Sequence, residues 1–217
     1  MSDLGSSLPN AARLPLPEEI AHGRVIAILR GLEPKAALEV AGAVVAGGVR
    51  ALEVTLGSPD ALAGVALLRQ ELGNSACIGA GTVLTHGDAG AALAAGAQFI
   101  VSPNTNPGVI GLAVGYRIPA LPGAMTPTEV VTAWSAGAAA VKLFPASALP
   151  PTYVQELRGP LPDVLLVPTG GVDADAAARW LESGAAAVGV GGWLTSANGL
   201  DEVERRAAQL AALAVSR

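Results

Sequence analysis

One lysine of this chain lies inside an apolar segment. Lys142 is the only charged residue of segment 139–145, which reads AAVKLFP, and the sequence contains just one other lysine, Lys35. Burying an ammonium group costs free energy unless something compensates its charge. A desolvated, neutral amine is a nucleophile that condenses with a ketone carbonyl to an iminium. The iminium draws electrons toward nitrogen and so assists cleavage of a nearby carbon–carbon bond. We therefore predict that Lys142 is a reactive amine.

Such chemistry needs an acid/base to move protons, and Glu53 fits this role. Repeated short segments end in a glycine that we interpret as the C-terminal stop of a helix, at Gly48, Gly96, Gly137 and Gly184. Their spacing is close to two βα units. Counting five residues on from each glycine gives structurally matched positions, which are Glu53, Val101, Lys142 and Gly189. Glu53 and Lys142 are thus predicted to share one register.

Strand alternation gives both side chains a direction. Glu53 should point with Ala51, and Lys142 with Ala140, while their immediate neighbours face the helices. Strands two and six lie opposite one another in a ring of eight, and barrel interiors stack side chains in layers. The acid and the amine are therefore expected to face each other across the barrel. A structural ion pair is the alternative interpretation of the same two residues.

The elements that would position these residues follow a repeating βα pattern. Eight apolar or β-branched runs are predicted as strands, namely Val25–Arg30, Ala51–Leu56, Cys77–Val83, Phe99–Pro103, Ile118–Gly123, Ala140–Pro145, Val164–Gly171 and Ala187–Gly192. Helix starts are indicated by Ser58-Pro59-Asp60, Asn106-Pro107 and Thr126-Pro127, and a short helix is expected at Glu18–His22. The pattern predicts an α/β protein, a single-domain (β/α)8 TIM barrel over residues 18–217 with a short N-terminal extension, residues 1–17.

Other strand ends carry candidate binding groups. Pro168-Thr169-Gly170-Gly171 ends the seventh strand and Gly189-Val190-Gly191-Gly192 the eighth, and these two loops frequently bind phosphate in such barrels. Gly pairs also serve simple turns, so the phosphate site is one of two interpretations. Arg30 could receive a carboxylate or a phosphate, or form a surface salt bridge. Thr82 offers a hydroxyl, or merely caps a turn.

Composition excludes several function classes. A formal charge of −5 without a basic cluster argues against nucleic acid as a partner. A membrane partner is not expected, because no uninterrupted apolar run is long enough to span a bilayer. One cysteine, Cys77, rules out an internal disulfide and suits a reducing cytoplasm. No metal and no cofactor are expected, since His, Cys, Asp and Glu show no ligand spacing. We assign no chemistry to Cys77, His22 or His86.

Several motifs, taken in order, resemble one enzyme family. They are Glu53-Val54-Thr55, Gly79-Ala80-Gly81-Thr82, Val101-Ser102-Pro103, Pro122-Gly123, Lys142-Leu143-Phe144-Pro145 and Pro168-Thr169-Gly170-Gly171. Together they are similar to the 2-keto-3-deoxy-6-phosphogluconate (KDPG) / 4-hydroxy-2-oxoglutarate (KHG) aldolases from about residue 25 to 194. The resemblance implies a metal-free class I aldolase, usually a homotrimer. As our main expectation, this lyase splits the phosphorylated keto sugar acid 2-keto-3-deoxy-6-phosphogluconate into pyruvate and glyceraldehyde 3-phosphate.

The resemblance also implies roles for single residues. Lys142 matches the Schiff-base lysine and Glu53 the general acid/base. The pyruvate pocket falls on Thr82, Pro103 and Phe144, and the distal phosphate on Thr169, Gly170, Gly171 and Gly191. Some members place an arginine where this chain has Gly57, so Arg30 is expected to bind the pyruvate carboxylate instead. Some place a serine where this chain has Gly192, so backbone N–H groups are expected to make that contact.

Alternative functions remain open on sequence grounds. Activity on unphosphorylated 4-hydroxy-2-oxoglutarate would accompany the gluconate reaction. The segments Ile26-Ala27-Ile28-Leu29-Arg30-Gly31, Ser102-Pro103-Asn104 and Ala113-Val114-Gly115-Tyr116 also resemble the related 6-phosphogalactonate aldolase, whose substrate differs in configuration at one carbon. A hypothesis of another class is a sugar-phosphate-binding barrel without turnover, in which Lys142 only pairs with Glu53.

Overall fold

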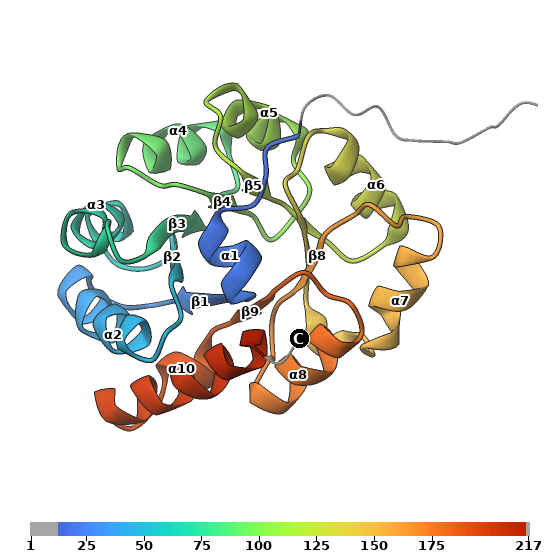
Figure 1. Ribbon diagram of the computed structural model, residues 1–217. Helices are drawn as coiled ribbons and strands as arrows, with labels where there is room; N and C mark the ends of the chain where they lie inside the picture. Colours follow the sequence, from blue (N-terminus) through green and yellow to red (C-terminus); the bar gives the residue numbers. More distant parts are fainter. Residues whose placement is uncertain (1–12, 216–217) are drawn as a thin grey trace, which may run out of the picture.

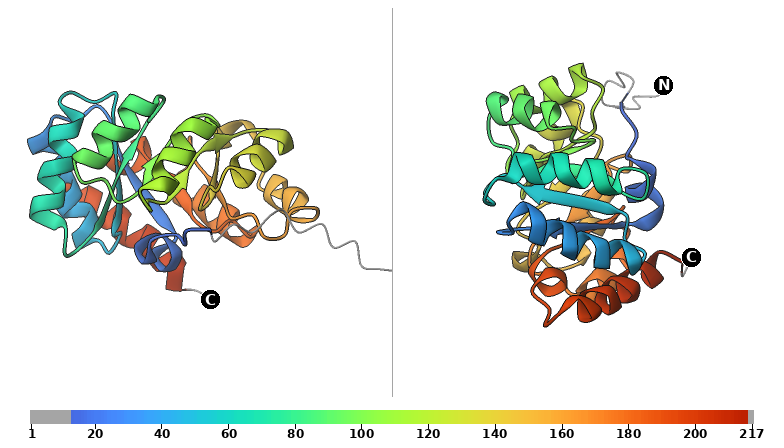
Figure 2. Two further views of the ribbon diagram at one scale, coloured as in Figure 1. Left: turned by 90° about the horizontal axis from the view of Figure 1, so that it is seen from above. Right: turned by 90° about the vertical axis from the view of Figure 1, so that its left-hand side faces the viewer.

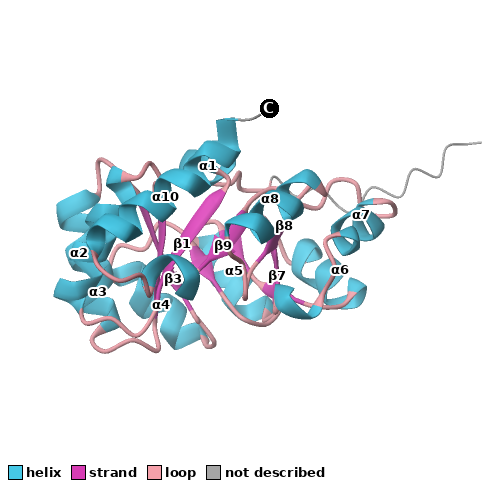
Figure 3. Ribbon diagram, turned by 90° about the horizontal axis from the view of Figure 1, so that it is seen from below, coloured by secondary structure: helices cyan, strands magenta, loops and turns pink. Residues whose placement is uncertain are grey.

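The chain forms an α/β fold in which parallel strands curl into a half-barrel and helices lie outside them (Figures 1 and 3). The computed structural model describes residues 13–215. A six-stranded sheet has the order β5-β4-β3-β2-β1-β9, and a three-stranded sheet has the order β6-β7-β8. All pairs in both sheets are parallel, so every strand ends at the same side of the fold.

The strands are short, and most of them follow the predicted runs. They are β1 (Val25–Leu29), β2 (Ala51–Thr55), β3 (Cys77–Gly81), β4 (Ile100–Val101), β5 (Ala120–Leu121), β6 (Gly123–Ala124), β7 (Val141–Leu143), β8 (Leu166–Pro168) and β9 (Val188–Val190). Each predicted run contains a strand, but the runs extend too far. The predicted strand Ile118–Gly123 is divided into β5 and β6 at Pro122, whose nitrogen carries no hydrogen to donate.

Helices follow the strands and cover their outer side. They are α1 (Glu18–Gly23), α2 (Pro34–Ala46), α3 (Ala61–Leu72), α4 (His86–Ala94), α5 (Pro107–Gly115), α6 (Pro127–Ser135), α7 (Thr152–Arg158), α8 (Ala174–Glu182), α9 (Gly192–Thr195) and α10 (Leu200–Val215), with a 3-10 turn η1 (Ala146–Ala148). The short helix expected at Glu18–His22 is confirmed as α1. Within residues 13–215, none of these helices has the length and apolar character needed to cross a bilayer.

Two of three predicted helix starts are confirmed. The Asn106 side chain accepts hydrogen bonds from the backbone of α5, and Thr126 forms a capping box with Glu129 at α6. The third motif, Ser58-Pro59-Asp60, does precede a helix, but the predicted cap is wrong, because α3 begins at Ala61 and the residue before it is Asp60 rather than Ser58. The Ser58 hydroxyl is instead engaged with the β1–α2 turn, so it is not free to cap a helix.

The repeated glycines have the predicted role. Gly48, Gly96, Gly137 and Gly184 all have positive φ, between 93° and 101°, directly after a helix. This left-handed conformation strains residues that carry a Cβ, which is why glycine recurs there. Equivalent helix stops fix the number of residues between each helix and the next strand, so they set the register of Glu53 and Lys142.

Side chains divide into two packed layers, as the alternation predicts. Leu52, Val54 and Val141 pack with the helices in the larger cluster. Ala51 and Ala140 pack on the concave side in a second cluster. Its other members from the strands, or from the residue directly before a strand, are Ile26, Cys77, Phe99, Val101, Leu121, Val167 and Ala187. By strand alternation, Glu53 and Lys142 lie on this concave side.

Helix α1 covers the amino-terminal ends of the strands (Figures 1 and 2). Its Ile20 is fully buried in the concave-side cluster, and Leu16 packs against the same cluster. The Arg13 guanidinium lies 3.5 Å from the centre of the Trp134 ring and donates to the Trp134 carbonyl. Residues 13–17 thus contact the folded domain, while residues 1–12 lie outside the described part. The domain boundary after residue 17 stays a prediction.

Candidate active site

The parallel strands bring predicted site residues to one end of the fold. Arg30, Thr82, Pro103, Phe144 and Thr169 each follow the last residues of a strand. This end lies opposite α1, so it is not filled by the helix that covers the amino-terminal ends (Figure 2). In barrels of parallel strands, sites form at this end.

Lys142 is the central residue of β7 and is only 4% exposed. Its neighbours across the sheet are Gly123 and Val167, neither of which can carry charge. The Nζ atom lies 5.1 Å from the centre of the Phe144 ring. Among the described residues, no hydrogen bond or ion pair reaches the amine. The chain therefore buries a primary amine that forms no hydrogen bond with the described residues.

Glu53 is the central residue of β2 and is 1% exposed. Its Oε1 atom is buried without a hydrogen-bond partner in the described part of the chain. It forms no ion pair with Lys142 there, so the structural ion pair, our alternative interpretation, is not found. A buried carboxyl oxygen that lacks a partner costs free energy and is expected where a ligand would complete the site.

Gly81 gives the Glu53 carboxyl its space. A Cβ built on Gly81 would overlap Oε1 of Glu53. We expect Gly81→Ala to displace the carboxyl and lower kcat about 100-fold, as misplacing a catalytic group by about 1 Å can do. Steady-state kinetics on the purified variant would measure this, with circular dichroism as a check of folding.

Gly57→Ala is the matched control for that substitution. Gly57 follows β2 in the same region, and a Cβ built there meets no atom within 4 Å. The control should keep its kcat within about twofold, since surface substitutions away from special features change little. Equal effects of the two substitutions would show that the space beside Glu53 is irrelevant.

Thr82, directly after β3, has a left-handed backbone with φ of 59°. This conformation is costly for a β-branched residue and persists only where the surroundings enforce it. The Ser102 hydroxyl donates to the Val83 carbonyl at 2.7 Å, and the Asn106 amide donates to the Leu84 carbonyl at 3.1 Å. Sequence reasoning assigned no role to Ser102, although its place beside Pro103 in a strand-end motif was a signal.

Arg30 is exposed at the end of β1, and its side chain has no hydrogen-bond partner among the described residues. Hydrogen bonds from β2 and the residues that follow it fix the turn that carries Arg30. The Ser58 hydroxyl accepts from the Gly31 backbone at 2.8 Å and lies 3.0 Å from the Thr55 hydroxyl. Both hydroxyls are buried. The backbone of the arginine turn is thus fixed while its guanidinium stays free to meet an anion.

The two glycine loops meet around one cavity. A cavity of about 330 Å³ is lined by residues of the β8–α8 and β9–α9 connections, namely Gly171, Val172, Asp173, Gly191, Gly192 and Trp193. In the described part of the chain, the backbone N–H groups of Gly192 and Trp193 donate no hydrogen bond. Such N–H groups suit an anion. Trp193 is a lining residue that our sequence reasoning missed, although it directly follows the glycine pair.

Thr169 and Gly170 do not line this cavity. Thr169 is buried, its hydroxyl donates to the Val167 carbonyl at 3.2 Å, and its side chain lies against Gly189. Gly170 packs against the Phe144 ring, which its Cβ would approach at 3.3 Å. Phe144 therefore connects the surroundings of Lys142 with the loop that leads to the cavity.

Pro103 packs against β6. Its carbonyl group lies against Gly123, where no Cβ could be accommodated. The Thr105 hydroxyl donates to the Gly123 carbonyl at 2.8 Å and holds the same two segments together. Because Gly123 pairs with Lys142 across the sheet, Pro103 is close in the fold to the strand that carries the amine.

Cys77 and the two histidines lie apart from these residues. Cys77 begins β3, and burial, with a smaller contribution from the charge of Glu19, raises the pKa of its thiol to about 12. His22 is on α1, which covers the amino-terminal ends of the strands, and His86 begins α4 and lines a different cavity between α4 and α5. Within residues 13–215, no three side chains of His, Cys, Asp or Glu are grouped to hold a metal ion.

Known proteins resemble this chain over most of its length. The family model described as KDPG and KHG aldolase matches residues 16–209. The 2-dehydro-3-deoxy-6-phosphogalactonate aldolase of Escherichia coli K12 is 42% identical over 189 residues, 87% of this chain and 91% of the relative. The 2-dehydro-3-deoxy-phosphogluconate aldolase of Treponema pallidum is 36% identical over 184 residues, 84% and 87% of the two chains. The solved structure of native KDPGal superposes with a TM-score of 0.84 at 38% identity, over 89% of this chain and 96% of that one.

The chain is a carbon–carbon lyase of the aldolase type. It belongs to the KDPG and KHG aldolase family, whose members typically use the class I, Schiff-base mechanism. The resemblance seen in the sequence motifs is confirmed. A sugar-phosphate-binding barrel without turnover, our hypothesis of another class, is therefore not retained.

Proposed function

We propose that this chain cleaves 2-dehydro-3-deoxy-6-phosphogalactonate to pyruvate and glyceraldehyde 3-phosphate. The observation that favours this substrate is the higher identity to the galactonate enzyme of Escherichia coli, 42%, than to the gluconate enzyme of Treponema pallidum, 36%. It supports our alternative over our main expectation, the gluconate substrate, which remains the second candidate together with 4-hydroxy-2-oxoglutarate. Both sugar acids would give the same products, because the carbon at which they differ, C4, becomes the aldehyde carbon when the C3–C4 bond breaks.

In this mechanism the neutral Lys142 amine attacks the C2 ketone of the substrate. The carbinolamine loses water and becomes an iminium. Lys142 supports this role because its side chain is buried on a central strand and its amine has no hydrogen-bond or ion-pair partner among the described residues. The two wall residues assigned to the pyruvate pocket, Phe144 and Pro103, would help to exclude water from the intermediate. Arg30, presented by a fixed turn, would receive the substrate carboxylate.

Glu53 would carry the protons of the next steps. As a base it removes the proton of the C4 hydroxyl, and the C4 oxygen becomes the aldehyde carbonyl as the C3–C4 bond breaks. The electrons of that bond form the C2–C3 double bond of an enamine, and the electrons of the iminium double bond move onto nitrogen. Glyceraldehyde 3-phosphate then leaves, and the protonated Glu53 returns a proton to C3. Water hydrolyses the resulting iminium and releases pyruvate. The carboxyl oxygen buried without a partner supports this role, and the Thr82 hydroxyl would orient the keto acid beside it.

The distal phosphate would lie in the cavity between the two glycine loops. Gly171, Gly191 and Gly192 line it, and the free N–H groups of Gly192 and Trp193 support anion binding. In this proposal Thr169 and Gly170 do not contact the phosphate. Thr169 supports the loop through its contact with Gly189, and Gly170 supports it through the Phe144 ring. Asp173 also lines the cavity, so the N–H donors must outweigh one carboxylate.

Gly192→Asp tests the phosphate site. Open space surrounds a Cβ at this position, so the backbone should tolerate the change. The added carboxylate would repel the phosphate, and we expect KM for the phosphorylated substrate to rise about 100-fold, since juxtaposed like charges cost several kcal/mol. Formation of the pyruvate adduct should be unchanged.

Gly192→Ser is the matched control. It adds a neutral side chain of similar size, and a hydroxyl can donate to phosphate, so KM should stay near that of the wild type. A phosphate site elsewhere would leave KM of the aspartate variant unchanged as well.

The substrate itself is tested by direct comparison. Cleavage of the phosphogalactonate, the phosphogluconate and 4-hydroxy-2-oxoglutarate would be followed side by side through pyruvate release. The proposal predicts the highest kcat/KM for the galactonate compound. A higher value for the gluconate compound would contradict the substrate assignment while leaving the aldolase mechanism intact.

Three broader predictions accompany this function. A closed eight-stranded (β/α)8 barrel is supported by the bridge between Thr169 and Gly189 and by segment 120–124, which pairs with β4 through β5 and with β7 through β6. A homotrimer is supported by the family resemblance, and light scattering of the purified protein would measure it.

A cytoplasmic location follows from the proposed metabolic substrate, and cell fractionation would test it.

A further inference from the structure

The wall of the proposed phosphate cavity includes one large side chain. Trp193 is the second residue of α9 and lines the cavity next to Gly192. Helix α9 has four residues, a length at which a helix is not stable by itself. The position of Trp193 must therefore be fixed by contacts from outside α9.

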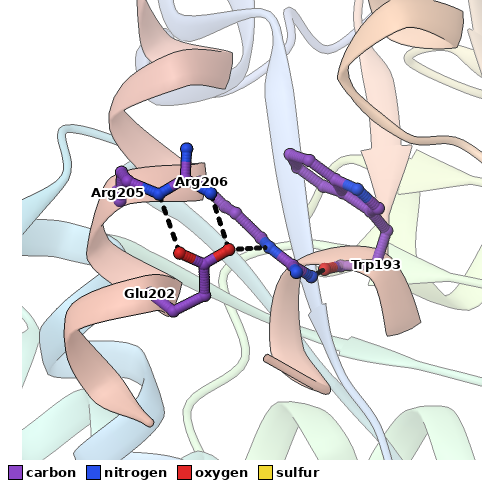
Figure 4. A network of polar contacts seen from close by, with 4 residues as sticks. All are labelled: Trp193, Glu202, Arg205 and Arg206. Carbon is purple, nitrogen blue, oxygen red and sulfur yellow. Dashed lines mark hydrogen bonds and ion pairs between the residues drawn. The ribbon is translucent and has the colours of Figure 1, made fainter. Parts of the chain in front are cut away.

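Arg206 on α10 supplies such contacts (Figure 4). Its Nη1 donates to the Trp193 carbonyl, and its guanidinium carbon lies 5.0 Å from the centre of the Trp193 ring. The carbonyls in the last turn of a helix lack partners within the helix, and a cation there is favourable. Arg206 thus satisfies the end of α9 and packs on the Trp193 ring at the same time.

Glu202 holds Arg206 in place. Its Oε1 accepts from Arg206 Nε at 2.7 Å, one turn away on α10. Arg205 binds the same carboxylate through Nε and Nη2, both at 2.7 Å, but no contact joins Arg205 to Trp193 (Figure 4). The hydrogen bonds from the two arginines lower the pKa of Glu202 to about 2, so the carboxylate stays charged under assay conditions.

We propose that Arg206 is a positioning residue for the distal phosphate, acting through Trp193. It rigidifies α9 so that the N–H groups of Gly192 and Trp193 keep a fixed direction toward the cavity. This inference rests on the proposed function, because it requires the phosphate to bind in the cavity between the glycine loops.

Arg206→Ala should raise KM for the phosphorylated substrate about tenfold, the effect of losing one charge-assisted hydrogen bond. The value of kcat and the yield of the borohydride-trapped pyruvate adduct should not change, since neither requires the phosphate. Arg206→Lys should give partial rescue, because lysine keeps the charge but cannot reach both Glu202 and Trp193 with a planar guanidinium.

Arg205→Ala is the matched control. It removes the same charge from the adjacent residue and the same partner from Glu202 without touching Trp193. Its KM should equal that of the wild type. Equal KM values for the two alanine variants, or a loss of adduct in Arg206→Ala, would overturn the positioning role. Wild-type protein that traps no pyruvate would instead contradict the proposed function, so the two failures are distinguishable.

Discussion

Lys142→Ala is expected to abolish cleavage of every substrate named above. The reaction needs an amine that forms the iminium, and removing a covalent nucleophile lowers kcat by roughly 10⁴-fold or more in comparable enzymes. The described part of the chain offers no second buried lysine, because Lys35 is exposed on α2. Pyruvate release over long incubations, measured against a blank without protein, would give the residual rate.

Lys35→Ala is the control for that variant, since it removes the only other lysine of the chain. It should retain wild-type kcat and KM. Because Lys142 is buried, the alanine variant also loses the packing of the methylene chain, so its fold should be checked by thermal unfolding. Retained cleavage in Lys142→Ala would end the Schiff-base account.

Glu53→Gln should reduce turnover by about 10²- to 10⁴-fold, the usual contribution of a general acid/base. The amide has nearly the shape of the carboxyl group and fits the same space beside Gly81, so packing should be preserved. Adduct formation with pyruvate should be partly spared, because Lys142 is still present. Exchange of the pyruvate methyl protons with deuterated water should be lost, since that step requires a base at C3.

Measuring adduct formation and methyl-proton exchange separately distinguishes a general acid/base from a structural carboxylate. Glu39→Gln on the exposed side of α2 removes a carboxylate far from the strand ends and should change neither readout. Were Glu53 a structural residue only, its variant would lose adduct formation and proton exchange in parallel. Normal exchange with Glu53→Gln would assign the base to another group.

Much of the fold could be predicted from glycine placement and apolar alternation. The helix stops at Gly48, Gly96, Gly137 and Gly184 are visible because positive φ strongly favours glycine. The side of each strand on which Glu53 and Lys142 lie follows from period-two geometry alone. Strand ends were less predictable, because apolar residues such as Val83 and Phe99 pack well on either side of the point at which the ladder hydrogen bonds stop.

Contacts between distant segments could not be predicted. The motif around Ser58 indicated a helix cap, but its hydroxyl binds the Gly31 turn, 27 residues away. Nothing local shows that Arg206 reaches the Trp193 carbonyl or that Ser102 holds the turn after Thr82. These side chains act at ranges set by the tertiary fold, whereas motif reasoning finds residues whose role depends on their immediate neighbours.

The most direct test of the central claim is peptide mapping after borohydride reduction in the presence of pyruvate. With only two lysines in the chain, the position of the adduct can be assigned without ambiguity. The account predicts one reduced pyruvyl group on the peptide that contains Lys142 and none on the peptide that contains Lys35. An adduct on Lys35 alone, or an unmodified Lys142 peptide under conditions in which the enzyme turns over, would contradict it.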